Sequence, residues 1–374
     1  MHRFLLGHND APDWRTSVHQ CLEQLGPVPP DANLGFLYLS DHHGADAEAI
    51  VELLRLQTGV SHWTGTVGMG VIATGTEYYD GPALSILIGA FEPDSFRCFH
   101  SGGRDLKPLT EGEAEWLSGS SQHFAVVHGD PRNMAVPLMI EAMGSEIPGG
   151  FSVGGLASSN TDHFPLIAGT VASAGLSGVV FNESTQVSTA LTQGCSPISA
   201  PVEVTESLKN ILVTLGGRPA LEVMKEAMGE MLARDLNKAA GYIFAGLPVE
   251  GSDTGDYMVR NLVGVDPDNG LVAIGETIET GRNVMFCRRD GQTAQDDLLR
   301  MIQDIRKRAG ERPIRGGLYF SCLGRGRHMF GEASRELGII QQELGDVPIA
   351  GFFANGEISH SRLYGFTGVL TLFH

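Results

Sequence analysis

The chain has 374 residues, 44 of them acidic and 26 basic, so its formal net charge at pH 7 is -18. A charge of this sign argues against nucleic acid or an anionic membrane surface as the main partner. Hydrophobic residues make up 42% of the chain, which is typical of a globular protein and excludes a disordered one. The 49 glycines exceed average usage but follow no fixed period, which excludes a collagen-like fibre.

The cysteines and the apolar runs indicate a cellular compartment. The five cysteines are odd in number and form no Cys-x-x-Cys or Cys/His cluster, which favours free thiols and predicts no metal site. The glycine motifs of phosphate loops and Rossmann folds are incomplete, so no cofactor is expected. The apolar run after Met1 is too short for a signal peptide, and no run of about 18 apolar residues follows. We therefore expect a cytoplasmic protein without a transmembrane helix.

Four segments have the apolar spacing of helices. Thr110 and Glu113 have the spacing of a capping box, and Pro219 suits a first helical turn. Gly59 is a suitable end for the first helix. The expected helices are 45–58, 110–118, 219–237 and 293–309.

Short apolar runs predict strands between these helices. The clearest seam in the chain is at 183–218, where polar turn residues cluster, and we expect two domains, 1–200 and 201–374. The expected strands are Leu34–Leu39, Ala83–Phe91, Phe124–His128, Gly178–Phe181, Gly241–Ala245, Leu271–Ile274, Asn283–Arg288, Gly317–Ser321 and Gly368–Phe373.

An internal repeat organises the chain. Three segments, which begin at LGFLYLS, FAVVHGD and GGLYFSC, share the order strand, glycine-containing loop, helix, strand, strand. This order predicts an α/β fold of mixed α+β character, with layered sheets and helices built from repeated β-loop-α-β-β units. Each segment also carries two glycines five positions apart, which favours tight turns or close backbone approach to a ligand: Gly65/Gly70, Gly150/Gly155 and Gly351/Gly356.

The segment SCLGRGRH, residues 321–328, has the richest local chemistry. Cys322 ends a predicted strand, and nearby arginines and a helix N-terminus would lower the pKa of its thiol and favour a nucleophile. A buried, inert cysteine is the alternative. Arg325 is a natural clamp for a carboxylate, because its guanidinium can donate two parallel hydrogen bonds.

Glu357 follows Gly356 in an otherwise apolar stretch, IAGFFANGEI. A charged residue is seldom buried without a partner, so Glu357 either pairs with an arginine or faces the ammonium group of a ligand. Arg325 and Glu357 together would suit an amino acid, at the rim of a cleft formed by the repeated units.

A series of motifs, in this order and at this spacing, resembles the FIST domain family over nearly the whole chain. The chain departs from the usual family pattern at Ser196 and at Ser359-His360. The motifs are EYYDGPALS (77–85), GGLAS (154–158), QGCSPI (193–198), VTE (204–206), GRPAL (217–221), GDYMVRN (255–261), FCRRD (286–290), SCLGRG (321–326), AGFFANGEI (350–358) and YGFTGVLTLF (364–373).

The resemblance implies a FIST N-type region in 1–200, a FIST C-type region in 201–374, and a sensory module without established catalysis that binds small ligands in signalling. The expected partners are a small molecule, such as an amino acid or another carboxylate, and an unidentified signalling protein, with self-association left open. Two other hypotheses remain, a hydrolase or acyl transferase that uses Cys322, and an interaction scaffold without a ligand. The expected ligand-binding residues are Arg325, Gly324, Gly326, Asn355, Gly356, Glu357, Gly154, Gly155, Arg260 and Asp290.

Overall fold

The computed structural model describes residues 2–233, 241–249 and 256–374. The chain forms two compact units, the first from Met1–Thr192 with Asp297–His374 and the second from Gln193–Asp296. The boundary after Thr192 lies within the predicted seam at 183–218. The chain returns to the first unit at Asp297. This spatial division differs from the sequence regions 1–200 and 201–374, whose assignment stays a prediction.

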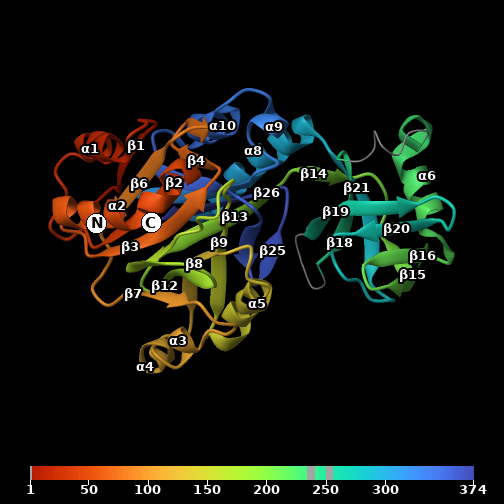
Figure 1. Cartoon of the computed structure of the whole chain (residues 1–374), viewed down its shortest axis with the longest axis horizontal. Coiled ribbons are helices and arrows are strands. Elements are labelled where there is room, and N and C mark those ends of the chain that lie inside the picture. Colours follow the sequence, from red (N-terminus) through yellow and green to blue (C-terminus); the bar gives the residue numbers. More distant parts are fainter. Residues whose placement is uncertain (1, 234–240, 250–255) are drawn as a thin grey trace. The chain divides into compact units, whose positions relative to one another are not determined.

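Three mixed sheets build the first unit (Figure 1). At the centre of each sheet lie three strands of its own, and these three are arranged in the same way in every sheet. In every sheet the first strand pairs in parallel with the second and antiparallel with the last. The predicted repeat is therefore confirmed in the fold. The central strands are β2 (Leu34–Ser40), β3 (His62–Gly68) and β6 (Leu84–Gly89); β8 (His123–Gly129), β9 (Gly150–Leu156) and β12 (Leu176–Asn182); and β22 (Gly316–Cys322), β23 (Ile349–Ala354) and β26 (Thr367–Phe373).

Each sheet is completed at one edge by a strand that lies next to the last central strand, and at the other edge by a hairpin from another repeat. The hairpin that follows β3 pairs with β23, the one after β9 pairs with β3, and the one after β23 pairs with β9. The three repeats thus exchange hairpins cyclically. The edge strands are β1 (Leu5–Asn9), β7 (Phe96–Ser101) and β13 (Val187–Gln193), and the hairpins are β4 (Gly70–Ala73) with β5 (Thr76–Tyr79), β10 (Leu166–Ala168) with β11 (Thr170–Ala172), and β24 (Glu357–His360) with β25 (Arg362–Tyr364).

The inner faces of the three sheets share one aromatic core. Tyr38, His128 and Phe320 occupy equivalent positions in the first strands, and their rings meet with centroids 5.6 to 6.2 Å apart. Burial lowers the pKa of His128 to about 3, so this imidazole is neutral in the core. The repeats are therefore arranged around a common centre.

Helices cover the outer faces of the sheets (Figure 1), and the longer ones bury an apolar stripe such as Met139, Ile140 and Met143. The predicted helix 45–58 is confirmed, with Gly59 in the left-handed conformation at its end, and 293–309 is confirmed within a longer helix. The helices are α1 (Trp14–Leu25), η1 (Asp41–Asp46), α2 (Ala47–Thr58), α3 (Lys107–Thr110), α4 (Ala114–Ser118), α5 (Val136–Glu146), α8 (Gly291–Ala309), α9 (Arg327–Phe330) and α10 (Arg335–Leu344).

One glycine in each repeat is required by close strand packing. A Cβ atom on Gly65, Gly154 or Gly351 would lie 1.8 Å from a carbonyl oxygen of the neighbouring first strand, which leaves room for hydrogen only. These three positions are equivalent in register. The glycine pair expected in the second repeat is therefore out of register, because Gly154 rather than Gly150 matches Gly65 and Gly351.

The second unit is built on six antiparallel strands whose pairings close into a ring around their own apolar core. Met224 and Met228 of the adjoining helix α6 (Ala220–Ala233) are buried in that core, whereas the predicted extension of the helix to 237 falls on residues outside the described ones. The ring consists of β15 (Val202–Leu208), β16 (Ile211–Leu215), β20 (Leu271–Ile274), β19 (Tyr257–Asp266), β18 (Ile243–Pro248) and β21 (Asn283–Arg289), with β14 (Cys195–Pro197) and β17 (Arg218–Pro219) added to it.

Two local expectations about helix starts are wrong. Thr110 is the last residue of α3 and bonds back to the carbonyl of Leu106, so it caps no helix that begins after it. Pro219 lies in β17, opposite Thr214, and the helix begins one residue later. In both places, the residue expected to begin the helix belongs instead to the element that precedes it.

Candidate functional site

Arg325 lies in the loop between β22 and α9, and its guanidinium pairs with Glu336 in the first turn of α10. Its Nε donates to Glu336 Oε1 at 2.8 Å, and its Nη2 lies 2.7 Å from the same oxygen. Both side chains are completely buried. The clamp that the sequence assigned to a ligand carboxylate is therefore filled by a carboxylate of the same chain, and Arg325 is not at a rim.

Glu336 collects further donors around this ion pair. Its carboxylate accepts from the hydroxyl of Tyr319 at 2.6 Å, the hydroxyl of Ser321 at 3.0 Å and the backbone amide of Gly326 at 3.1 Å. Buried charges are tolerated when they are paired and hydrogen-bonded in this way. The arrangement fixes the loop after β22 against the start of α10.

The exchanged hairpin β4–β5 adds Glu77 and Tyr79 to the same cluster. Glu77 Oε1 accepts from the backbone amide of Leu337 at 3.0 Å, and the hydroxyl of Tyr79 donates to Glu77 while accepting from the amide of Arg327. Burial, and then the charge of Glu336, raise the pKa of Glu77. The EYYDG motif thus fastens a hairpin of the first repeat to the helices of the third.

Glu357 begins β24 and is also completely buried. Its Oε2 accepts from the backbone amide of Thr367 at 3.1 Å and from the Thr367 hydroxyl at 2.7 Å. Burial raises the pKa of Glu357 to about 8, although Thr367 and Arg325 oppose this shift. The carboxyl group is therefore mostly protonated at neutral pH.

Cys322, beside Glu357, has the opposite electrostatics to those expected of a nucleophile. Burial is the largest effect that raises the pKa of the Cys322 thiol, the carboxylate of Glu357 adds to it once that group is ionised, and the weaker effects of Gly324 and Arg325 do not offset them. The expected lowering of its pKa is wrong, because Arg325 is neutralised by Glu336 and the thiol lies in a desolvated site. A thiol is a poor nucleophile when it stays protonated.

Nine of the predicted residues do meet in one region, at the carboxyl ends of β9, β22 and β23. Gly155 is the register partner of Glu357, and the amide of Asn355, an exposed residue, donates to the carbonyl of Leu156. Their roles as ligand-binding groups stay predictions. The nine are Cys322, Gly324, Arg325, Gly326, Asn355, Gly356, Glu357, Gly154 and Gly155.

The other two predicted residues belong to the second unit. Arg260, on β19, pairs with Glu276 and donates to the carbonyl of Val259. Asp290 accepts from the amide of Thr293 at 2.9 Å and pairs with Arg288. The Thr293 amide is the largest effect that lowers the pKa of Asp290. Each side chain thus has a local structural partner.

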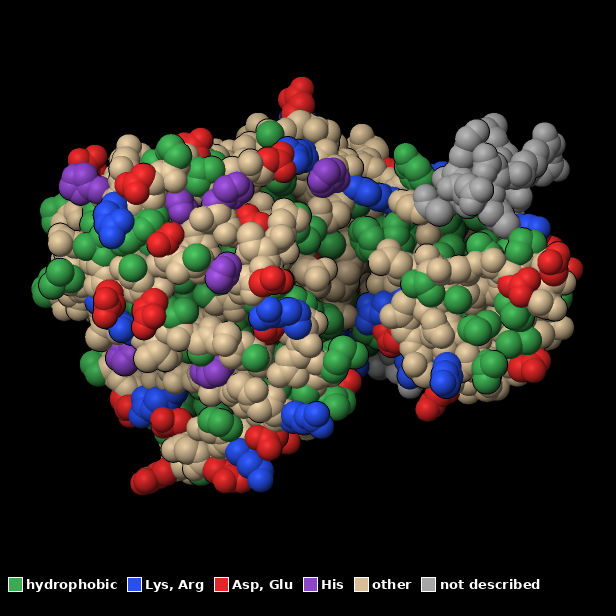
Figure 2. All heavy atoms as spheres, in the orientation of Figure 1, with side chains coloured by type: hydrophobic (Ala, Val, Ile, Leu, Met, Phe, Trp, Pro, Cys, Tyr) green, Lys and Arg blue, Asp and Glu red, His purple; other side chains and the backbone are tan. Residues whose placement is uncertain are grey.

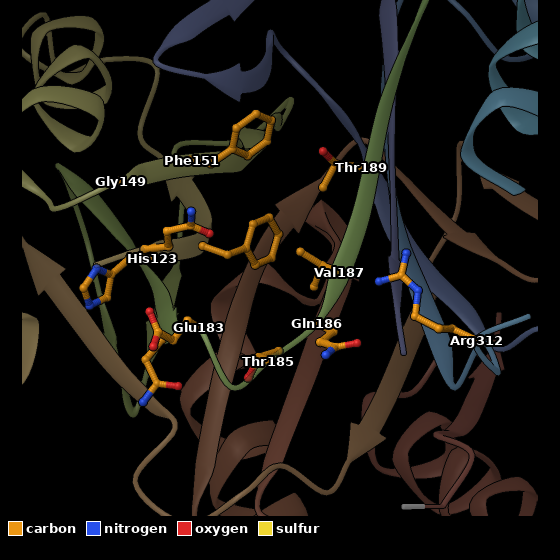
Figure 3. Close-up of a pocket in the computed structure, with 12 residues that line it drawn as sticks. His123, Gly149, Phe151, Glu183, Thr185, Gln186, Val187, Thr189 and Arg312 are labelled. Atoms are coloured by element: carbon orange, nitrogen blue, oxygen red, sulfur yellow. The ribbon is translucent and has the colours of Figure 1, made fainter. Parts of the chain in front are cut away.

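A cavity of about 330 Å³ opens at the other end of the strands, where β8 and β9 begin and β12 ends (Figure 3). The turn after β12 and the edge strand β13 form its remaining wall. This volume is in the range of small-molecule sites. The lining residues are Gln122, His123, Phe124, Gly149, Phe151, Asn182, Glu183, Thr185, Gln186, Val187, Thr189 and Arg312.

The cavity combines an apolar floor with a polar rim. Phe124 belongs to the shared core, and Phe151 and Val187 pack against that core. In Figure 3, Phe151 is directed toward Thr189, and Arg312 is directed toward the strand that carries Val187. Asn182 holds the turn by accepting hydrogen bonds from the amide and hydroxyl of Ser184.

The sequence reasoning missed this cavity because it looked for ligand groups in the loops after each first strand. The signal that is present is the polar run NESTQVST at 182–189, which the sequence pattern also allows as part of a seam between domains.

Across residues 2–233, 241–249 and 256–374, no group of three or more His, Cys, Asp or Glu side chains is arranged to hold a metal ion.

Charged side chains of both signs lie on the surface. On the face that Figure 2 shows, lysine and arginine side chains are interspersed with acidic ones. Within the part of the chain that the structure describes, no helix has both the length and the apolar character needed to cross a membrane.

These features define a class of α/β protein, in which three repeats exchange hairpins and a mostly antiparallel unit is inserted between the second and third repeats. The chain belongs to the FIST family, because the FIST N domain model matches residues 33–218 and the FIST C domain model matches residues 220–360. The resemblance drawn from the motifs is confirmed. Both matches contribute to the first unit, since the third repeat from β22 through β24 lies in the FIST C match, which ends at residue 360 before β26.

Similar proteins occur in mycobacteria. The chain is 30% identical over 392 residues to the uncharacterized protein Rv0628c of Mycobacterium tuberculosis, with 99% of each chain covered. It is 29% identical over 334 residues to the uncharacterized protein Mb0898c of Mycobacterium bovis, with 83% of this chain and 82% of that protein covered. FIST domains are generally regarded as sensory domains that bind small ligands.

Proposed function

We propose that this protein is a sensory module that binds a small ligand, an amino acid or another carboxylate, and signals through a partner protein without catalysis of its own. The observation that carries the proposal is the 330 Å³ cavity in the unit to which both family matches contribute. Its lining is mostly polar, with apolar surface from Phe124, Phe151 and Val187, and a concave site of this size that offers both kinds of surface suits a small ligand.

The electrostatics of the buried cluster favour sensing over catalysis. An enzyme that used Cys322 as a nucleophile would need a thiolate near neutral pH, and the pKa of this thiol is raised. Arg325 is bound to Glu336, so it is not poised to stabilise a reacting group. The cluster of Arg325, Glu336, Glu77 and Tyr79 holds the hairpin of the first repeat against the third repeat, and we call it the structural lock. We expect the ligand to bind elsewhere, in the cavity.

The test is a thermal-shift screen of the purified protein against amino acids and organic acids, together with native mass spectrometry for copurified small molecules. A ligand that binds only the folded state raises the melting temperature with its concentration. We expect at least one small carboxylate to give a saturable shift. The absence of any shift across the set, together with protein that carries no small molecule, would contradict the proposal.

A further inference from the structure

Arg312, which lines the cavity, has hydrogen-bond partners of a different kind from those of the buried Arg325. Its Nε donates to the carbonyl of Ala309 at 2.9 Å and its Nη2 to the carbonyl of Arg308 at 2.7 Å. Among the described residues, no carboxylate forms an ion pair with Arg312. Its side chain is thus held at the end of α8 by neutral acceptors, and its positive charge remains available to a ligand.

Glu183, the acidic residue of the cavity, is exposed and is held by a neighbouring serine. Its Oε2 accepts from the backbone amide of Ser121 at 3.4 Å and from the Ser121 hydroxyl at 3.1 Å. Hydrogen bonds from Ser120 and Ser121 lower the pKa of Glu183, so the carboxylate is ionised and well solvated by its own neighbours. Among the described residues neither Glu183 nor Arg312 forms an ion pair, and an anionic ligand would find in Arg312 a guanidinium without a counter-ion.

The floor between these charges suits a flat or branched apolar group. The rings of Phe124 and Phe151 lie nearly parallel, with an interplanar angle of 22° and centroids 6.5 Å apart. Val187, on the facing strand β13, is partly buried against the same core. An apolar ligand body that covers these side chains would remove their exposed surface from water, which stabilises binding.

We propose that the cavity is the ligand site and that it takes a small monocarboxylate with an aromatic or branched aliphatic body. The carboxylate binds the guanidinium of Arg312, and the body lies against Phe151 and Val187. This inference rests on the proposed sensory function and names the ligand class and the residues that select it.

The first test uses isothermal titration calorimetry to compare two probes that share a benzyl group and carry opposite charges. Phenylacetate carries the carboxylate that Arg312 would bind, and benzylamine carries an ammonium group at the same place. The ammonium group cannot accept the charge-assisted hydrogen bond that the guanidinium donates to a carboxylate, and such a bond is worth about tenfold in affinity. We therefore expect phenylacetate, or the aliphatic 3-methylbutanoate, to bind at least about tenfold more tightly than benzylamine.

The second test separates the role of Arg312 from a general effect of charge. Arg312→Met should weaken binding of the carboxylate by about tenfold or more. Arg306→Met is the matched control, because Arg306 is an exposed arginine on α8 that also donates to a carbonyl, that of Glu343. The control should bind like the wild type. Urea unfolding of both variants verifies that each is folded.

Three results would overturn the inference. These are equal affinity of Arg312→Met and wild type for the carboxylate, tighter binding of benzylamine than of phenylacetate, and no binding of either carboxylate by wild-type protein. Each result leaves the proposed sensory function standing if the wider screen yields another ligand, so the two failures are distinguishable.

Discussion

The buried cluster around Arg325 and the cavity beside Arg312 contain the same residue types but differ in burial and in the partners of these residues. Both have an arginine, at least one glutamate and aromatic rings. In the cluster, Arg325 is completely buried and its guanidinium is bound to Glu336. At the cavity, the exposed Arg312 contacts only carbonyl groups among its described partners, and Glu183 is held by Ser121. The identity of the residues therefore does not distinguish a lock from a binding site. Burial and the choice of partner do.

The position of each region in the fold explains this difference. The cluster lies where an exchanged hairpin, a strand end and a helix start meet, so most of its polar groups find partners within the chain, although the buried Oε1 of Glu357 has no hydrogen-bond partner among the described residues. The cavity lies at the opposite ends of β8 and β9, beside β13, which is an edge strand and has a neighbour on one side only. Polar groups at such an edge are left to water or to a ligand.

The largest expected effect comes from breaking the lock. Arg325→Met leaves Glu336 buried without its counter-ion and close to Glu77, and loss of one partner of a buried pair costs about 3–5 kcal/mol. Urea unfolding should show a loss of this size. Arg218→Met, which breaks the exposed pair with Glu226, is the control and should change the free energy of unfolding little. Equal effects of the two variants would contradict the account of the cluster as a lock.

The next effect is a dependence of stability on pH. The pKa of Glu357 rises from an ordinary value of 4.5 to about 8 on folding. Between these pH values the folded state binds a proton that the unfolded state has released, so stability falls as pH rises, by up to about 1.4 kcal/mol per pH unit from this group. Glu357→Gln keeps an acceptor for Thr367 and removes the titration.

The measurement is the free energy of urea unfolding of wild type and Glu357→Gln at pH 5, 6, 7 and 8. The stability of the variant relative to wild type should increase steadily over this range. A constant difference between the two proteins would mean that Glu357 ionises in the folded state much as in the unfolded one.

A smaller and purely chemical effect concerns Cys322. Because burial and Glu357 raise the pKa of this thiol, iodoacetamide should alkylate it slowly in native protein at pH 7.5 and at a normal rate after unfolding in urea. Peptide mass spectrometry over time gives the rate at each cysteine. Rapid modification of native Cys322 would contradict this expectation and support the hypothesis that Cys322 is a nucleophile.

The smallest effect on stability is expected at the cavity. Arg312→Met removes an exposed side chain that bonds only to carbonyls among its described partners, so the free energy of unfolding should stay within about 0.5 kcal/mol of wild type. Urea titration checks this directly. A loss as large as that of Arg325→Met would show that the two arginines have the same structural role.

Much of the fold could be predicted from the sequence, because the central strands are continuous apolar runs. Leu34–Ser40 and Thr367–Phe373 are buried along their whole length, and the shared order of elements revealed the three repeats. The exchange of hairpins could not be predicted. Strands as short as Leu166–Ala168 carry little pattern, and their pairing partners lie in another repeat.

The grouping of residues in the buried cluster was predicted in part, whereas their role in ligand binding stays a prediction and the cavity beside Arg312 was not predicted. The motifs correctly indicated that Cys322, Arg325 and Glu357 lie close together, since the carboxyl ends of paired strands meet at one edge of a sheet. They did not reveal Glu336 as the partner of Arg325, because a glutamate at the start of a predicted helix looks like an exposed residue. Burial on this scale depends on packing between repeats.

The most direct test of the account is a crystal structure of the protein grown with the carboxylate that gives the largest thermal shift. The account predicts ligand density beside Phe151, Val187 and Arg312, with the ion pair between Arg325 and Glu336 intact. Ligand density next to Arg325, with that ion pair broken, would contradict it.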